Sequence, residues 1–347
     1  MRKVSRRRTS FSAVRLLFTL LLVTLSISLS PDQNTLSTSL NSANRSVSQR
    51  YINHDPIAIT NNNELAAVAN SGSGTAMDPY IIANWNISGA TVHGIYITGI
   101  TKHYRIENCV IGSSNTHGIF VEDVPPGLTT ITNNTCNDNR YSSIRLSSAS
   151  VSVVVNNTCS SNVGTGISLF RSHSSIVANN TCNNNSLSGI SLGGSETSNL
   201  ANNTCNHNDN HGIFVSSSDA ASVVNNNCNY NDQGIYLIFS NSSTVTNNTS
   251  NHNGWIGIYL YRSDSSIVTN NTCNHNHEYG LYLGYSYTSS IIVNNTCRDN
   301  GEDEIFWEFD RTFPITRPTP ILIRIGLFLS IIGLLFVILF FHRDNRC

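Results

Sequence analysis

The chain has 347 residues, of which only 12% are charged, about half the usual share for a globular protein. Its 20 Lys and Arg nearly balance its 21 Asp and Glu, which argues against a basic binding surface and predicts no nucleic-acid partner. A hydrophobic fraction of 39% argues against an acidic disordered chain. Asparagine is unusually frequent: 35 of its 48 copies lie between positions 133 and 300.

The N-terminus is typical of an export signal. Residues 1–30 combine a basic start, Arg2 to Arg8, with an apolar run from Leu16 to Leu29. Because this run is short for a bilayer span, it predicts a signal peptide, with an uncleaved anchor as the alternative. Residues 31–52 are rich in Ser, Asn and Thr, and we expect them to form a linker.

The C-terminus is typical of a membrane anchor. Residues 321–341 are apolar except for Arg324, which lies near one end where it can reach the interface, and predict a transmembrane helix. The Pro-containing residues 311–320 would link this helix to the preceding domain. With an export signal in front, we expect a single-pass protein of the cell membrane, its main domain outside and residues 342–347 in the cytoplasm.

Two phrases repeat through the middle of the chain with a common period of 22 to 24 residues. The first, Asn-Asn-Thr-Cys or a close variant, ends at Cys136, Cys159, Cys182, Cys205, Cys228, Ser250, Cys273 and Cys297. The second, Gly-Ile-x-Leu or a relative, begins at Gly166, Gly189, Gly212, Gly234, Gly257 and Gly280, among others. A period of this length is typical of solenoid proteins.

The repeat predicts an all-β parallel β-helix over residues 53–310, with about ten coils of ~23 residues. Each unit has three short β-favouring runs separated by Gly, Asn or Ser, which predicts three strands in every repeat, and none shows helical periodicity. Alternation places Ile258 and Leu260 inside and Tyr259 outside. Residues 302–310, acidic and aromatic, would cap the last coil.

The same alternation gives the asparagines a structural role. One asparagine of each repeat faces inward, where its amide can bond to the asparagines above and below in a ladder. The predicted ladder comprises Asn134, Asn157, Asn180, Asn203, Asn226, Asn248, Asn271 and Asn295. The repeated cysteines form a neighbouring inward column, for which we favour buried free thiols over vertical disulfides.

These residues resemble a known family. The segment Gly72–Ile82 (GSGTAMDPYII), followed by Trp85-Asn86-Ile87 and Gly94–Ile97, is similar to the first coil of NosD-like proteins, a group common on archaeal surfaces within the pectate-lyase-like superfamily. The resemblance implies a right-handed β-helix with a short N-terminal capping helix, for which Asn63–Ala69 is suitable. It is less informative about activity, because the superfamily includes lyases, hydrolases and binding proteins.

One outward column predicts a binding surface. Phe214, Tyr236, Tyr259 and Tyr282 occupy the outward position of consecutive Gly-Ile-x-Leu strands. Such an exposed aromatic stripe suits stacking on sugar rings, with the tyrosine hydroxyls available for hydrogen bonds. The alternative is that the rings stack on each other and stiffen the sheet. We therefore expect carbohydrate or cell-envelope components as partners.

Two pairs of turn residues are weaker candidates. Asp209 and Asp232 lie on adjacent coils, a placement that suits a glycosidase pair or one side of a calcium site. His252 and His275 are similarly placed, which suits copper binding. Neither cofactor is otherwise indicated by the sequence. We favour the interpretation that all four residues occupy solvated turns.

Three functional hypotheses follow. The first, which we favour, is a membrane-anchored surface protein that binds carbohydrate through the aromatic column without chemistry of its own. The second is a polysaccharide lyase or glycoside hydrolase, although residues 103–310 contain no Lys and few carboxylates. The third is a copper-accessory role implied by the NosD-like resemblance.

Overall fold

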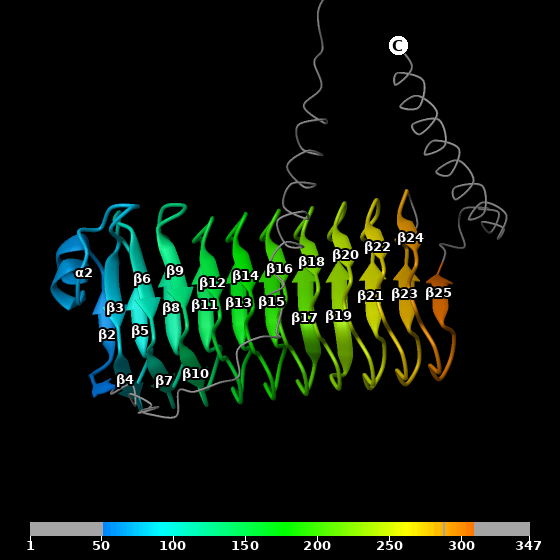
Figure 1. Cartoon of the computed structure of the whole chain (residues 1–347), viewed down its shortest axis with the longest axis horizontal. Coiled ribbons are helices and arrows are strands. Elements are labelled where there is room, and N and C mark those ends of the chain that lie inside the picture. The colour runs from blue at the N-terminus through cyan, green and yellow to red at the C-terminus, as the bar shows by residue number, and fades with distance from the viewer. Residues whose placement is uncertain (1–50, 287–288, 309–347) are drawn as a thin grey trace, which may run out of the picture. The chain divides into compact units, whose positions relative to one another are not determined.

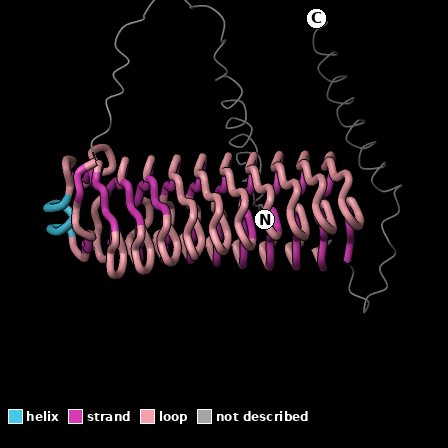
Figure 2. Tube along the Cα trace, turned by 90° about the horizontal axis from the view of Figure 1, so that it is seen from below, coloured by secondary structure: helices cyan, strands magenta, loops and turns pink. Residues whose placement is uncertain are grey.

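The computed structural model describes residues 51–286 and 289–308, which form a stack of β-coils with a helix at its N-terminal end (Figures 1 and 2). The coils follow each other in chain order, and all the strand pairs between them are parallel. The predicted parallel β-helix of about ten coils is therefore confirmed.

Three sheets run along the stack. The eleven-stranded sheet contains β2 (Ile57–Ile59), β5 (Ile95–Ile97), β8 (Ile119–Glu122), β11 (Ile144–Ser147), β13 (Ile167–Phe170), β15 (Ile190–Gly193), β17 (His211–Ser216), β19 (Gln233–Ile238), β21 (Ile258–Tyr261), β23 (Leu281–Gly284) and β25 (Ile305–Glu308). The ten-stranded sheet contains β3 (Tyr80–Ala83), β6 (Tyr104–Glu107), β9 (Thr129–Thr132), β12 (Val153–Val155), β14 (Ile176–Ala178), β16 (Asn199–Ala201), β18 (Ser222–Val224), β20 (Thr244–Thr246), β22 (Ile267–Thr269) and β24 (Ile291–Val293). The four-stranded sheet contains β1 (Ile52–Asn53), β4 (Trp85–Ser88), β7 (Val110–Gly112) and β10 (Thr135–Asn137).

The third side of the coil differs from the prediction of three strands in every repeat. Strands occur there only as far as β10, and later coils are joined by single bridges between residues such as Thr158 and Thr181. The bridging residue lies between the buried ladder asparagine and the buried residue at the cysteine position, and it is a threonine in each later coil except that of Asn227.

The core consists of inward columns from these sheets. Ile258 and Leu260 of β21 are buried while Tyr259 between them is half-exposed, as the alternation predicted. Because the strands pair in parallel and in register, identical side chains stack on successive coils, as Leu237, Leu260 and Leu283 do. This apolar packing holds the eleven-stranded and ten-stranded sheets around one continuous core.

The inward asparagines form hydrogen-bonded ladders. The Oδ1 atom of Asn203 accepts from both the backbone N–H and the side-chain amide of Asn180, each at 3.0 Å. Its own amide donates to the backbone carbonyl of Val177 at 2.9 Å and to Asn226 at 3.0 Å. The same contacts recur from Asn134 to Asn295, and a second ladder runs from Asn139 to Asn300. Turn amides that would otherwise be buried without partners are thereby satisfied.

The outward asparagine of each pair has a role that the sequence analysis did not identify. Asn133, Asn156, Asn179 and Asn202 are exposed and have φ between 56° and 58°, in the left-handed region that asparagine tolerates better than most residues. The pair therefore makes a turn in which the first residue supplies the backbone conformation and the second supplies the ladder.

The cysteines are buried thiols. All eight in the described part of the chain are free, and only Cys297 in the last coil is partly exposed. Ser250 takes the cysteine position in its coil and donates to the carbonyl of Gly257 at 2.6 Å. Cys109 instead occupies the asparagine column, where its backbone N–H donates to Asn134 Oδ1 at 2.9 Å.

Helix α2 (Asn62–Val68) covers the first coil. It begins and ends one residue before the expected segment Asn63–Ala69. The Asn61 side chain caps it by accepting from the N–H groups of Asn63 and Glu64, both at 3.0 Å. Leu65 is fully buried against the core. The helix thus closes the N-terminal end of the solenoid.

Several predicted segments lie outside the described residues: the signal peptide at 1–30, most of the linker at 31–52, the linker at 311–320, the transmembrane helix at 321–341 and the tail at 342–347. Within the described part of the chain, no helix has the length and apolar character needed to cross a bilayer. Of the expected cap at 302–310, residues 305–308 form β25, the last strand of the eleven-stranded sheet.

Candidate functional site: the outer face of the eleven-stranded sheet

The predicted aromatic residues lie side by side. Phe214 pairs with Tyr236, Tyr236 with Tyr259, and Tyr259 with Tyr282 in the parallel register of β17, β19, β21 and β23, and Phe306 of β25 continues the column. All five side chains are half-exposed on one face. We call this column and its neighbours Tyr261 and Tyr285 the aromatic stripe.

The rings of the stripe pack on one another. Tyr236 and Tyr259 are nearly parallel, with centroids 4.6 Å apart and planes at 8°. Tyr259 and Tyr282 meet edge to face at 4.8 Å and 74°, and Phe214 is tilted against Tyr236 at 5.5 Å. Self-stacking therefore does occur, and it fixes the rings in place while leaving part of each exposed. A preordered surface of this kind loses little entropy when it binds.

The tyrosine hydroxyls are neutral hydrogen-bonding groups. Tyr282 and Tyr285 donate to the Glu308 carboxylate at 2.9 and 3.2 Å. Burial raises the pKa of Tyr236 and of Tyr259 above the ordinary value, so both phenols keep their protons at neutral pH. The stripe thus presents apolar ring edges together with donor hydroxyls and carries little charge.

A second cluster on the same face was missed by the sequence analysis. At its N-terminal end, His93, Tyr96, His117 and Phe120 are in mutual contact, with ring centroids 5.0 to 5.6 Å apart. The signal was a histidine directly before the repeated Gly-Ile phrase, at positions 93, 117 and 211. We call these four residues, with Glu122 and Arg145, the histidine cluster.

Hydrogen bonding and burial determine the protonation state of His117 in this cluster. The Nδ1 atom of His117 accepts from the backbone N–H of Ser142 at 3.1 Å, so Nε2 carries the proton of the neutral ring. Burial, the Arg145 guanidinium and His93 lower the pKa of His117 to about 4. Beside it, Tyr96 donates to the Glu122 carboxylate, and Arg145 donates to Ser168 at 3.1 Å.

Small residues separate the two aromatic groups. In the column that joins Arg145 to Phe214, the outward positions are Ser168 and Ser191. The next outward column has Phe170, which is 40% exposed, followed by Gly193 and Ser216. Small side chains therefore separate the two aromatic regions in the first column, while Phe170 lies between them in the second.

The structure brings Asp209 and Asp232 to adjacent coils, as predicted, but not into a pocket. Both are exposed turn residues. Desolvation raises the pKa of Asp232, while Asp209 on the adjacent coil is an exposed turn residue like it. A glycosidase pair needs two carboxyl groups in contrasting environments, and these positions do not supply that contrast.

His252 and His275 belong to a stack of turn side chains. His207, Tyr230, His252 and His275 stack with centroids 4.8 to 5.1 Å apart and planes within 12°. A metal bound to imidazole nitrogen lies in the ring plane, so two nearly parallel stacked rings do not direct their nitrogens at one ion. In the described ranges, no group of three His, Cys, Asp or Glu side chains could hold a metal. Copper at His252 and His275 and calcium at Asp209 and Asp232 therefore stay predictions.

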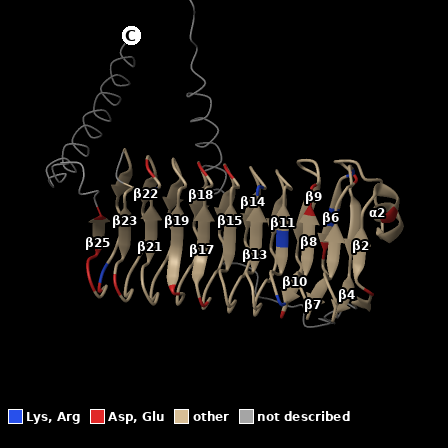
Figure 3. Ribbon diagram, turned by 180° about the vertical axis from the view of Figure 1, so that it is seen from behind, with Lys and Arg blue, Asp and Glu red and all other residues tan. Residues whose placement is uncertain are grey.

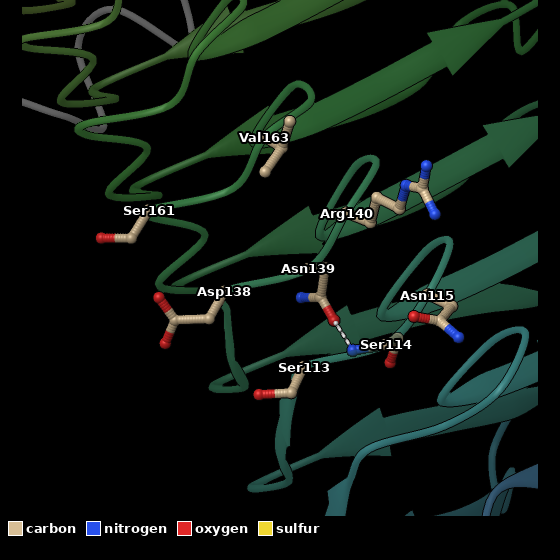
Figure 4. Close-up of a pocket in the computed structure, with 8 residues that line it drawn as sticks. All are labelled: Ser113, Ser114, Asn115, Asp138, Asn139, Arg140, Ser161 and Val163. Carbon is tan, nitrogen blue, oxygen red and sulfur yellow. Dashed lines mark hydrogen bonds between the residues drawn. The ribbon is translucent and has the colours of Figure 1, made fainter.

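A shallow pocket of about 370 Å³ lies on the turns that follow β7 and β10. Its lining is shown in Figure 4: Ser113, Ser114, Asn115, Asp138, Asn139, Arg140, Ser161 and Val163. The Asp138 and Arg140 side chains point in opposite directions there. Asn139 is engaged with Ser114, whose backbone N–H donates to it at 3.2 Å. The polar groups do not converge on a common point.

Comparison with protein families identifies the fold class. The family described as right handed beta helix region matches residues 66–228 and 188–313. The chain belongs to this family. The match confirms the right-handed β-helix of pectate-lyase-like type that the resemblance implied, while the NosD-like grouping remains a prediction. A search of curated protein sequences gave no match.

Solved structures are similar in fold at low identity. The A-module of mannuronan C-5 epimerase AlgE4 from Azotobacter vinelandii has a TM-score of 0.50 and 12% identity, over 75% of this chain and 89% of that one. The Dettilon tailspike protein has a TM-score of 0.50 and 14% identity, over 74% and 61%. The AlgE6 A-module has a TM-score of 0.48 and 17% identity, and the chain covers 65% of its length. These likenesses show the fold alone.

Proposed function

We propose that the protein binds an extended carbohydrate chain along the aromatic stripe and does so as a membrane-anchored surface protein. The observation that carries the proposal is the register of five half-exposed aromatic side chains on one face. Aromatic residues with hydroxyl groups bind sugars through ring contacts and hydrogen bonds. The anchor rests on the apolar residues 321–341.

The dimensions and charge of the stripe suit a polysaccharide better than a compact ligand. Five coils at a spacing of ~4.8 Å give a track of roughly 20 Å, long enough for several sugar units. The pocket described above lies on the turns after β7 and β10 rather than under the stripe. One protein of similar fold, AlgE4, is named for its action on mannuronan, a polysaccharide, which is compatible with a ligand of this class.

A glycan array that includes mannuronan tests the proposal directly, with the purified full chain and with Tyr236→Ala/Tyr259→Ala. We expect the double substitution to weaken binding at least tenfold, because each aromatic stacking contact contributes about 1 kcal/mol. Tyr230→Ala is the matched control, since Tyr230 is 52% exposed on a turn away from the stripe. Equal binding by all three proteins would refute the proposal.

A catalytic role is the second candidate, favoured by the histidine cluster rather than by Asp209 and Asp232. A neutral His117 with a fixed tautomer, the Tyr96–Glu122 pair and the Arg145 cation lie on adjacent coils of one face. These are groups that can transfer a proton and stabilise a developing anion.

Product analysis of bound glycans distinguishes the two candidates. If the chain is an enzyme, wild-type protein should shorten or isomerise a glycan, and Tyr96→Phe and His117→Gln should each abolish the change while leaving binding at the stripe intact. If binding is the function, the glycan should be recovered unchanged from all of them.

A further inference from the structure

The two halves of the described solenoid differ in charge. Residues 51–206 carry eight Asp and Glu and five Lys and Arg, whereas residues 207–308 carry ten Asp and Glu and two Arg. The second range holds the strands of the aromatic stripe, β17 to β25. Its acidic residues other than Glu308 lie outside the strands, and in Figure 3 they mark the turns. The stripe therefore lies in a negative potential, which attracts cations and repels anions.

A column of residues with three carboxylates borders the stripe where the chain enters the strands. The backbone N–H of Trp255 donates to the Asp232 carbonyl at 2.8 Å, and that of Glu278 donates to the Trp255 carbonyl at 2.9 Å. The N–H of Glu302 donates in turn to the Glu278 carbonyl at 2.7 Å. These four residues thus follow one another on successive coils. We call them the acidic border.

The acidic border is in contact with the stripe. The Trp255 side chain is 38% exposed and packs edge to face against Tyr259, with centroids 6.3 Å apart and planes at 68°. Its Nε1 donates to the Glu278 carboxylate. Tyr279 contacts the next ring of the stripe at 5.1 Å. Burial, together with the Glu302 and Glu278 carboxylates, raises the pKa of Tyr279, so these carboxylates act on the rings electrostatically.

The protein does not neutralise the border carboxylates. Neither ion pair of the described residues includes one of them. Arg262 follows β21 and so lies at the other end of the strands, over the rings of Tyr261 and Tyr285 at 5.6 and 5.8 Å. The negative charge of the border therefore remains available to a ligand on the stripe.

A hydrogen-bond acceptor without a partner lies next to the border. Gln233 follows Asp232 and is 5% exposed, and its Oε1 atom has no hydrogen-bond partner in the part of the chain that the structure describes. It pairs in register with His211, whose ring contacts Phe214 and Tyr236 of the stripe. A buried acceptor of this kind is costly, and its place beside the rings suits a ligand that supplies N–H donors.

We propose that the stripe and the acidic border together bind a polymer of amino sugars whose amines are free and protonated. This inference rests on the proposed function and adds the chemical class of the glycan. The sugar rings stack on the tyrosines, and the amines donate charge-assisted hydrogen bonds to the border carboxylates. Asp232 and Glu278 lie two coils, roughly 10 Å, apart, which is close to the length of a disaccharide in an extended chain. A polyuronate meets charge of its own sign here.

Two matched hexasaccharides test the proposal. Calorimetry of the full chain in detergent compares a hexamer of glucosamine with its N-acetylated form, in which the amine charges are absent. A pH of about 6 keeps Asp and Glu of ordinary pKa ionised. We expect the glucosamine hexamer to bind about tenfold more tightly than the acetylated one, and the difference to shrink at high salt, because exposed charges are screened.

Variants separate the charge from the stacking. Asp232→Asn/Glu278→Gln should weaken binding of the glucosamine hexamer about three- to tenfold and leave that of the acetylated hexamer unchanged. Asp138→Asn/Glu196→Gln, the matched control, removes two exposed charges from coils before the stripe and should change neither affinity. The double tyrosine substitution used for the array should weaken binding of both hexamers.

The outcomes distinguish this inference from the proposed function. Failure of the glucosamine hexamer to bind, binding of the acetylated hexamer or mannuronan as tight as that of glucosamine, or equal effects of the two charge variants would overturn the amino-sugar assignment. If the tyrosine substitution still weakened binding of any glycan, the stripe would remain a glycan site. A lysine hexapeptide that bound as tightly as the glucosamine hexamer would show that charge alone suffices, which also contradicts the assignment.

Discussion

At the scale of the residue, asparagine performs two tasks that differ by one position. Asn202 is exposed with φ of 56°, and Asn203 is buried with its amide in the ladder. A glycine would satisfy the first position, because it adopts positive φ without steric cost. At the second position, only an amide matches the alternating donors and acceptors of the column.

This difference predicts contrasting effects of substitution at neighbouring residues. Asn203→Ala leaves the Asn180 N–H and the Val177 carbonyl buried without the partners they have now. Each such group costs about 1–3 kcal/mol, so we expect a loss of roughly 2–6 kcal/mol. Asn202→Gly, the control, should change stability by less than about 1 kcal/mol. Urea unfolding of both variants checks this, and equal midpoints would contradict the role given to the ladder.

At the scale of the element, the outer face of the eleven-stranded sheet carries two histidines, His117 before β8 and His211 in β17, that are neutral in the folded chain. Burial lowers the pKa of His211 to about 4, from an ordinary value of 6.5, and that of His117 also to about 4. Below pH 6.5 the unfolded chain takes up protons at these positions and the folded chain does not. Stability is therefore full above pH 6.5 and falls as the pH drops toward 4.

Melting temperatures between pH 7 and pH 5 test this linkage above the range where most carboxylates titrate. We expect the wild type to lose stability on acidification and His117→Gln/His211→Gln to lose clearly less. His252→Gln, at an exposed turn position, should behave like the wild type. A pH dependence unchanged by the double substitution would show that these rings do not carry it.

At the scale of the whole molecule, the repeat predicted the coil, the inward columns and the register of the aromatic stripe, because a residue one period later occupies the same place one coil later. Other features have no repeated phrase. The histidine cluster depends on contacts across the sheet from residues of different phrases, such as Tyr96 and Glu122. The ring stacking of His252 and His275 could not be predicted from the sequence either, because the spacing of residues does not determine the orientation of their rings.

The most direct test of the carbohydrate-binding account is footprinting of the full chain with hydroxyl radicals, in the presence and absence of the glycan that binds best on the array. The account predicts protection of Phe214, Tyr236, Tyr259 and Tyr282, with the exposed Tyr230 and the exposed Ile176, Ile267 and Ile291 of the ten-stranded sheet unchanged. Protection confined to the histidine cluster, the turns or the ten-stranded sheet would contradict it.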